Sequence, residues 1–132
     1  MKFPALSICI AFLFTQCHTR NTTDLQGTWK LDSVYSFYNG FDMTNPGEEP
    51  LYHFQPDGRL RMTQDTEFRY FIYNIQGDSL TYSTLDDKRI DRLLIVKLND
   101  QHLVLKKEKP LLFKGGNNQQ RFEIKYFSKV KY

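Results

Sequence analysis

From residue 27 onward the chain alternates between short apolar runs and turn signals, and this alternation constrains the fold more than any other feature. The runs are rich in the aromatic and β-branched residues that favour strands, whereas the links between them hold Gly, Pro, Asn and Asp. The predicted strands are 27–37, 51–55, 59–64, 67–75, 79–85, 89–98, 102–107 and 121–132. Eight strands with short links and no amphipathic helix of ordinary length predict an all-β, antiparallel, up-and-down meander. Closure into a barrel would remove both sheet edges.

The links differ in length in a way that predicts two unlike ends. Three alternate links are tight turns at Pro56-Asp57-Gly58, Gln76-Gly77-Asp78 and Asn99-Asp100-Gln101. Both long links, 38–50 and 108–120, belong to the other set. Since alternate links of a meander lie at opposite ends, one end should be closed and the other should carry adaptable loops, where binding sites tend to lie.

The N-terminal residues read as an export signal. Met1-Lys2 precedes an apolar run over residues 3–14, which is too short to cross a membrane because a crossing helix needs roughly 20 residues. The sequence therefore predicts a signal peptide over residues 1–16. The run ends in Phe14-Thr15-Gln16-Cys17, which resembles a bacterial lipobox, although Phe14 and Gln16 stand where a lipobox usually has Leu and a small residue.

Cysteine usage favours the lipobox interpretation. Cys9 and Cys17 are the only two cysteines, so removal of residues 1–16 leaves Cys17 alone at the new terminus. Acylation of Cys17, with palmitate as a typical chain, would account for a single exported thiol. An ordinary signal peptide with an incidental cysteine is the alternative. The polar residues 18–24 are predicted to form a short tether that joins the closed end of the barrel, so that the loop-bearing mouth points away from the membrane.

Several short motifs carry a family resemblance that covers residues 25–132. They are Gly27-Thr28-Trp29 at the start of the first strand, Phe54 followed by Asp57-Gly58, Gly77-Asp78-Ser79-Leu80, and the turn within 98–105. Together they resemble the lipocalin-like domains of small bacterial lipoproteins. The resemblance implies a barrel base in which Trp29, next to Gly27, lies under a basic side chain of the last strand, here Lys129 or Lys131. Such domains usually have Arg there, and Lys lacks the planar guanidinium that stacks on a ring.

The aromatic excess is the main candidate for a binding function, with eleven Phe and eight Tyr in 132 residues. The first strand is predicted to place Trp29, Leu31, Ser33, Tyr35 and Phe37 on one face. The predicted ligand- or partner-binding residues are Tyr35, Phe37, Phe41, Met43, Tyr70, Phe113 and Tyr126.

The alternative is that the aromatic and other apolar side chains fill the core, and this is preferred for Trp29, Leu31, Phe54, Leu60 and Phe122. The two interpretations are balanced for Phe41, Met43 and residues 111–113. A cavity lined by Tyr35, Tyr70 and Tyr126 would favour a small ligand. A packed interior with Phe41, Met43 and Phe113 exposed would favour a protein partner.

Other classes of function find little support in the sequence. His18, His53 and His102 do not have the spacing of metal ligands, so no metal or other cofactor is expected. The adjacent pairs Asp86-Asp87 and Glu48-Glu49 diverge on an extended chain and form no catalytic dyad, so no enzyme is expected. Lys and Arg exceed Asp and Glu by only three, which gives no reason to expect a nucleic-acid partner.

These features together predict a lipid-anchored protein of the cell envelope, at the periplasmic face or the surface of a Gram-negative outer membrane. Its barrel is predicted to bind a small apolar ligand in the mouth formed by residues 38–50 and 108–120. The alternative is a non-catalytic interaction subunit that docks through the same loops onto an envelope protein complex.

Overall fold

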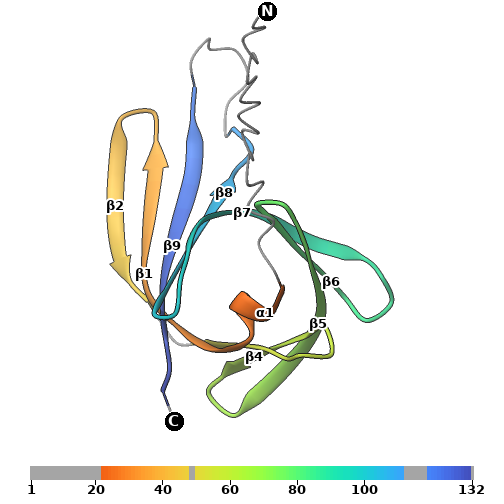
Figure 1. The fold of residues 1–132 in the computed structure, drawn as a ribbon. Coiled ribbons are helices and arrows are strands. Elements are labelled where there is room, and N and C mark those ends of the chain that lie inside the picture. Colours follow the sequence, from red (N-terminus) through yellow and green to blue (C-terminus); the bar gives the residue numbers. More distant parts are fainter. Residues whose placement is uncertain (1–21, 48–49, 112–118, 132) are drawn as a thin grey trace, which may run out of the picture.

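The computed structural model describes residues 22–47, 50–111 and 119–131 (Figure 1). Its strands form one antiparallel sheet in the order β2-β1-β3-β4-β5-β6-β7-β8-β9, and β9 pairs back with β1. Eight strands thus close into a barrel, and β2 lies outside the closure. The predicted all-β, eight-stranded, up-and-down barrel is confirmed. The predicted signal peptide and Cys17 lie outside the described residues.

The observed strands follow the predicted ones closely, with one addition in the first long link. The elements are α1 (Thr22–Leu25), β1 (Gly27–Tyr38), β2 (Phe41–Pro46), β3 (Leu51–Phe54), β4 (Arg59–Gln64), β5 (Glu67–Gln76), β6 (Ser79–Ser83), β7 (Arg89–Leu98), β8 (His102–Glu108) and β9 (Arg121–Lys129). In the described part of the chain, no helix has the length and hydropathy of a membrane-crossing segment.

The extra strand β2 corrects the prediction that residues 38–50 form a loop. Asn39 and Gly40 both have positive φ, at 45° and 89°, as the two central residues of a tight hairpin turn require. β2 then pairs with residues 33–38 of β1, whereas β3 pairs with residues 27–30. One edge of β1 is therefore shared by two strands, and the β1–β2 hairpin projects beyond the barrel beside β9 (Figure 1).

The closed end of the barrel is filled by apolar side chains. Its buried members are Leu25, Trp29, Leu31, Phe54, Leu60, Tyr73, Leu80, Leu93, Ile95, Leu103, Leu105 and Phe127. α1 begins inside the predicted tether and places Leu25 in this core with no exposed surface. The indole Nε1 of Trp29 donates a hydrogen bond to the Leu25 carbonyl at 2.8 Å, so α1 serves as the plug of the barrel base.

A β-bulge in β1 reverses the alternation of inward and outward side chains in the second half of the strand. The register between β1 and β9 shifts between Leu31 and Ser33, which leaves Asp32 as the extra residue. The backbone amide of Gly47 donates a hydrogen bond to the Asp32 carbonyl at 2.7 Å, which stabilises the backbone at the bulge. Leu31 is buried, but beyond the bulge Val34 packs against the core, so Tyr35 and Phe37 face outward. The prediction that Trp29, Leu31, Ser33, Tyr35 and Phe37 share one face is therefore wrong.

Strand β9 also differs from expectation, because its more apolar face points outward. Phe127 is buried, so Glu123 and Lys125, which alternate with it, face the barrel interior. Phe122 lies on the other face and stacks on Phe37 with ring centroids 5.0 Å apart. The assignment of Phe122 to the core is therefore wrong.

Candidate functional site

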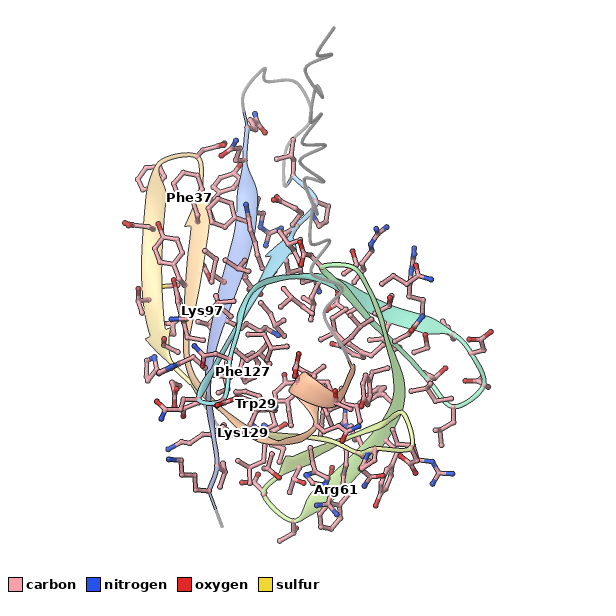
Figure 2. All side chains as sticks on the ribbon, in the orientation of Figure 1. Trp29, Phe37, Arg61, Lys97, Phe127 and Lys129 are labelled. Atoms are coloured by element: carbon pink, nitrogen blue, oxygen red, sulfur yellow. The ribbon has the colours of Figure 1, made fainter. Side chains whose placement is uncertain are left out.

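The open end of the barrel carries a groove along the β1–β2 hairpin. It has a volume of about 480 Å³ and is lined by residues 36–38 of β1, 41–43 of β2, 121–123 of β9 and Lys109. Phe41 and Met43 lie in it with 79% and 58% of their surface exposed. Three of the predicted binding residues, Phe37, Phe41 and Met43, thus border the groove from the β1–β2 hairpin, although the ring of Phe37 lies on the outer face against Phe122. Figure 2 shows Phe37 far from the base residue Trp29.

A second cavity adjoins this groove where β2 and β3 part. It has a volume of about 580 Å³, and its lining includes Leu31, Val34, Tyr52, Gln64, Glu123 and Lys125. Ser36 and Glu123 belong to both linings, so the two hollows are neighbours, and together they are called the trough. The trough runs from the packed core along β1 and β9 to the tip of the hairpin.

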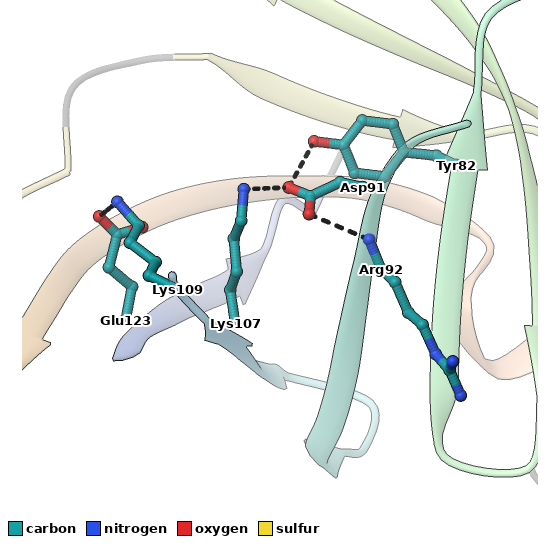
Figure 3. A network of polar contacts seen from close by, with 6 residues as sticks. All are labelled: Tyr82, Asp91, Arg92, Lys107, Lys109 and Glu123. Atoms are coloured by element: carbon teal, nitrogen blue, oxygen red, sulfur yellow. Dashed lines mark hydrogen bonds and ion pairs between the residues drawn. The ribbon is translucent and has the colours of Figure 1, made fainter. Parts of the chain in front are cut away.

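An ionic network lies in the barrel mouth on β6, β7 and β8, next to the groove strand β9 (Figure 3). The side chain of Asp91 on β7 is 11% exposed and accepts a hydrogen bond from Lys107 Nζ at 2.8 Å. It also accepts one from the Tyr82 hydroxyl at 3.3 Å and one from the Arg92 amide at 3.0 Å. Burial, and then the neighbouring Asp91, raise the pKa of Tyr82, so this phenol stays protonated and acts as a donor.

Beside that network, the cations of β8 and β9 are not all paired. Lys109 Nζ forms an ion pair with Glu123. Lys125 points inward from the same strand as Glu123, and among the described residues its ammonium group makes neither an ion pair nor a hydrogen bond. Burial lowers the pKa of Lys125, while Glu123 and Asp91 partly offset this effect. The trough therefore has one cation at its inner end without a direct partner.

Three predicted tyrosines do not meet in a common cavity. Tyr35 is turned outward by the bulge, and its hydroxyl donates to Asp42 at 3.3 Å. Tyr70 is 44% exposed because Phe71 and Tyr73 take the inward positions of β5, and Tyr126 is 40% exposed because Phe127 takes that of β9. A cavity lined by Tyr35, Tyr70 and Tyr126, which would have favoured a small ligand, is therefore not formed. Phe113 lies outside the described residues.

The predicted base residues do come together. Lys129 Nζ lies 5.2 Å from the centroid of the Trp29 ring, within reach of a cation–π contact, as Figure 2 illustrates. Gly27 lies against Lys129, and Lys131 is exposed at the end of the described chain. Lys129 thus occupies the position over Trp29 that was predicted for Lys129 or Lys131, and these contacts stabilise the closed end, away from the trough.

Sequence reasoning missed the inward-facing charges. Lys125, Glu123, Lys107 and Asp91 lie on strands, where charged residues usually mark the solvated face. One signal was available: Glu123 and Lys125 are in phase with Phe127, so burial of Phe127 implies that they also face inward. Choosing between Phe127 and Phe122 as the core residue requires the register with β1.

The remaining titratable groups do not suggest a metal centre. Within residues 22–47, 50–111 and 119–131, no three His, Cys, Asp or Glu side chains are grouped so as to hold a metal ion. His53 Nδ1 lies 2.6 Å from the hydroxyl oxygen of Thr28, and burial followed by the charge of Arg61 lowers the pKa of His53.

No protein-family model matches the chain, and no curated protein matches it significantly.

Proposed function

We propose that this protein is a lipid-anchored component of the cell envelope whose lipocalin-like barrel binds a small, largely apolar ligand. The groove of the β1–β2 hairpin is the observation that carries the proposal. Its volume of about 480 Å³ falls within the range of ligand pockets, and aromatic and thioether side chains line much of it. The ligand would lie between the hairpin and β9, against Tyr38, Phe41 and Met43.

The anchor in this proposal is a lipid on Cys17, after removal of residues 1–16. Four residues, 18–21, separate Cys17 from the start of α1, so an anchored barrel would stay close to the membrane surface. Mass spectrometry of the mature protein tests this part. An acylated N-terminal Cys17 supports it, and an unmodified N-terminus or an uncleaved chain refutes it. Cys17→Ser should release the protein from the membrane fraction.

The second candidate function is docking onto an envelope protein, and the exposure of Phe41 and Met43 favours it. Apolar side chains this exposed on a projecting hairpin are common at interaction surfaces. The outer edge of β2 also has free backbone groups, since β2 pairs only with β1 among the described strands.

A titration with N-phenyl-1-naphthylamine, a neutral apolar fluorophore, tests ligand binding. Phe41→Ser and Met43→Ser should each weaken binding about tenfold, as expected for loss of a buried apolar contact of roughly 1.5 kcal/mol. Phe68→Ser is the matched control, because Phe68 is 57% exposed on β5 and does not line the groove. Equal effects of Phe41→Ser and Phe68→Ser would contradict the proposed site.

Native mass spectrometry of the mature protein separates the two candidate functions. A co-purifying small mass that is lost in Phe41→Ser and kept in Phe68→Ser supports a ligand carrier. A bare mass, together with a stoichiometric protein complex that only Phe41→Ser disrupts, supports the docking function instead.

A further inference from the structure

Lys125 is placed where the packed core gives way to the trough. In the sheet it lies between Val34 of β1 and Leu105 of β8, and Leu105 is a buried core residue. Phe127, two residues toward the base, is also buried, and Glu123, two residues toward the mouth, lines both parts of the trough. Lys125 therefore holds a positive charge at the inner end of the trough, where polar and apolar side chains both line the hollow, and the mainly apolar groove of the hairpin lies further out.

The charges around Lys125 leave it uncompensated by direct contact. Three inward ammonium groups, those of Lys107, Lys109 and Lys125, face two inward carboxylates. The guanidinium of Arg121 adds a fourth cation nearer the tip of the groove, where it donates a hydrogen bond to the Pro110 carbonyl. Asp91 is bound to Lys107 and Glu123 to Lys109, so both anions are already engaged. A half-buried cation without a partner is unfavourable for folding, and titratable groups in such surroundings are enriched at functional sites.

We infer that the ligand of the trough is an amphipathic anion, whose carboxylate or phosphate group binds Lys125 and whose apolar tail runs outward to the β1–β2 hairpin. This inference rests on the proposed ligand-binding function and adds the chemical class of the ligand. The Nζ of Lys125 donates a charge-assisted hydrogen bond to the anion. Binding adds an anion to a barrel mouth in which cationic side chains outnumber carboxylates.

The length of the trough fits a medium-chain tail. Val34 is the cross-strand neighbour of Lys125, and Tyr38, at the tip of β1, lies four residues further along the same strand. At about 3.3 Å per residue the distance between them is roughly 13 Å. A dodecyl chain has a comparable length, so its end would reach Phe41 and Met43 in the groove.

Four dodecyl probes at concentrations below micelle formation test the inference by displacement of N-phenyl-1-naphthylamine. Dodecanoate and dodecyl phosphate carry the anion, dodecanol is the neutral analogue, and dodecyltrimethylammonium carries the opposite charge. Both anions should bind the wild-type protein about tenfold or more tightly than dodecanol, as expected for a charge-assisted hydrogen bond. Whichever of the two anions binds more tightly identifies the head group.

Variants at Lys125 locate the anion site. Lys125→Met should abolish the preference for anions and leave the affinity for dodecanol unchanged, whereas Lys125→Arg should keep it. Lys97→Met is the matched control, because Lys97 is an exposed cation on β7 outside both hollows. The inference is overturned if dodecanol binds as tightly as dodecanoate, or if Lys125→Met and Lys97→Met weaken dodecanoate equally, and in either case the proposed function stands. If none of the four probes binds the wild-type protein, the proposed function fails together with the inference.

Discussion

Replacing Gly27 by Ala should destabilise the barrel through two separable effects. Gly27 has φ of +119°, a backbone conformation that side chains with a Cβ rarely adopt. A Cβ built at this position would also lie 2.9 Å from Cε of Lys129, the residue whose ammonium group lies over Trp29. The variant must therefore strain the backbone and also move Lys129 away from the ring.

The expected size follows from these two contributions. Backbone strain of this kind costs about 1–3 kcal/mol. Loss of the Lys129–Trp29 contact adds about 0.5–1 kcal/mol. Gly27→Ala should therefore lower the free energy of unfolding by roughly 1.5–4 kcal/mol.

The comparison variant is Gly58→Ala, because Gly58 has φ of +86° and no atom within 4 Å of its hypothetical Cβ. The loss of unfolding free energy in Gly58→Ala therefore measures backbone strain in the absence of a steric clash. Urea unfolding, followed by the fluorescence of Trp29 and by circular dichroism, gives both values. Gly27→Ala should also cost about 0.5–1 kcal/mol less in a Lys129→Ala background, as a double-mutant cycle measures. A cost that is the same in both backgrounds would refute the role of Lys129, and a cost near zero would refute the strain argument.

The remaining predictions concern the charged side chains. Lys125→Met should raise the free energy of unfolding at pH 7 by roughly 1–2 kcal/mol. Because the folded pKa of Lys125 is lowered, the cost of burying its charge is relieved as pH rises through that pKa, and the advantage of Lys125→Met in urea unfolding should shrink toward pH 10. His53 also has a lowered folded pKa, so stability should fall as pH drops below about 6.5, and His53→Gln should flatten this slope in thermal scans from pH 7.5 to 5. Asp91→Asn removes the buried anionic partner of Lys107 and should lower the free energy of unfolding in urea by roughly 1–3 kcal/mol. Glu108→Gln removes a carboxylate that is 73% exposed and should lower it by less than about 1 kcal/mol. Equal losses of unfolding free energy in the two variants would contradict the view that Asp91 stabilises the barrel mouth through its bond with Lys107.

The strand positions were predictable because both of their signals are local. Apolar runs and Gly, Pro, Asn and Asp turns place β3 to β8 within a few residues of their observed ends. The base was predictable only through the resemblance to lipocalin-like domains, which implied a basic side chain of the last strand over Trp29 and left Lys129 and Lys131 as alternatives, and the structure places Lys129 there.

The errors have a different origin, because they depend on pairing between distant strands. The link after Tyr38 was read as a loop from its Pro, Gly and Asn content, although Asn39-Gly40 is itself a hairpin signal. A single extra residue, Asp32, turns Tyr35 outward, and nothing in the alternation of β1 reveals it. The inward position of Lys125 depends in turn on the register of β9 against β1, so the candidate anion site required the structure.

The closure of the barrel by β1 and β9 has a consequence for how the chain folds. Trp29 pairs with Lys129, a hundred positions away in the sequence, so the barrel closes only when the last strand arrives. Topologies dominated by such distant contacts fold slowly, roughly in milliseconds to seconds, because the entropy of a long loop is lost before the contacts form. During this interval one edge of β1 and the interior face of β8 remain open to other chains. A nascent chain that lacks residues 121–131 should therefore aggregate, and aggregation during synthesis, rather than the stability of the finished barrel, should limit the yield of this protein.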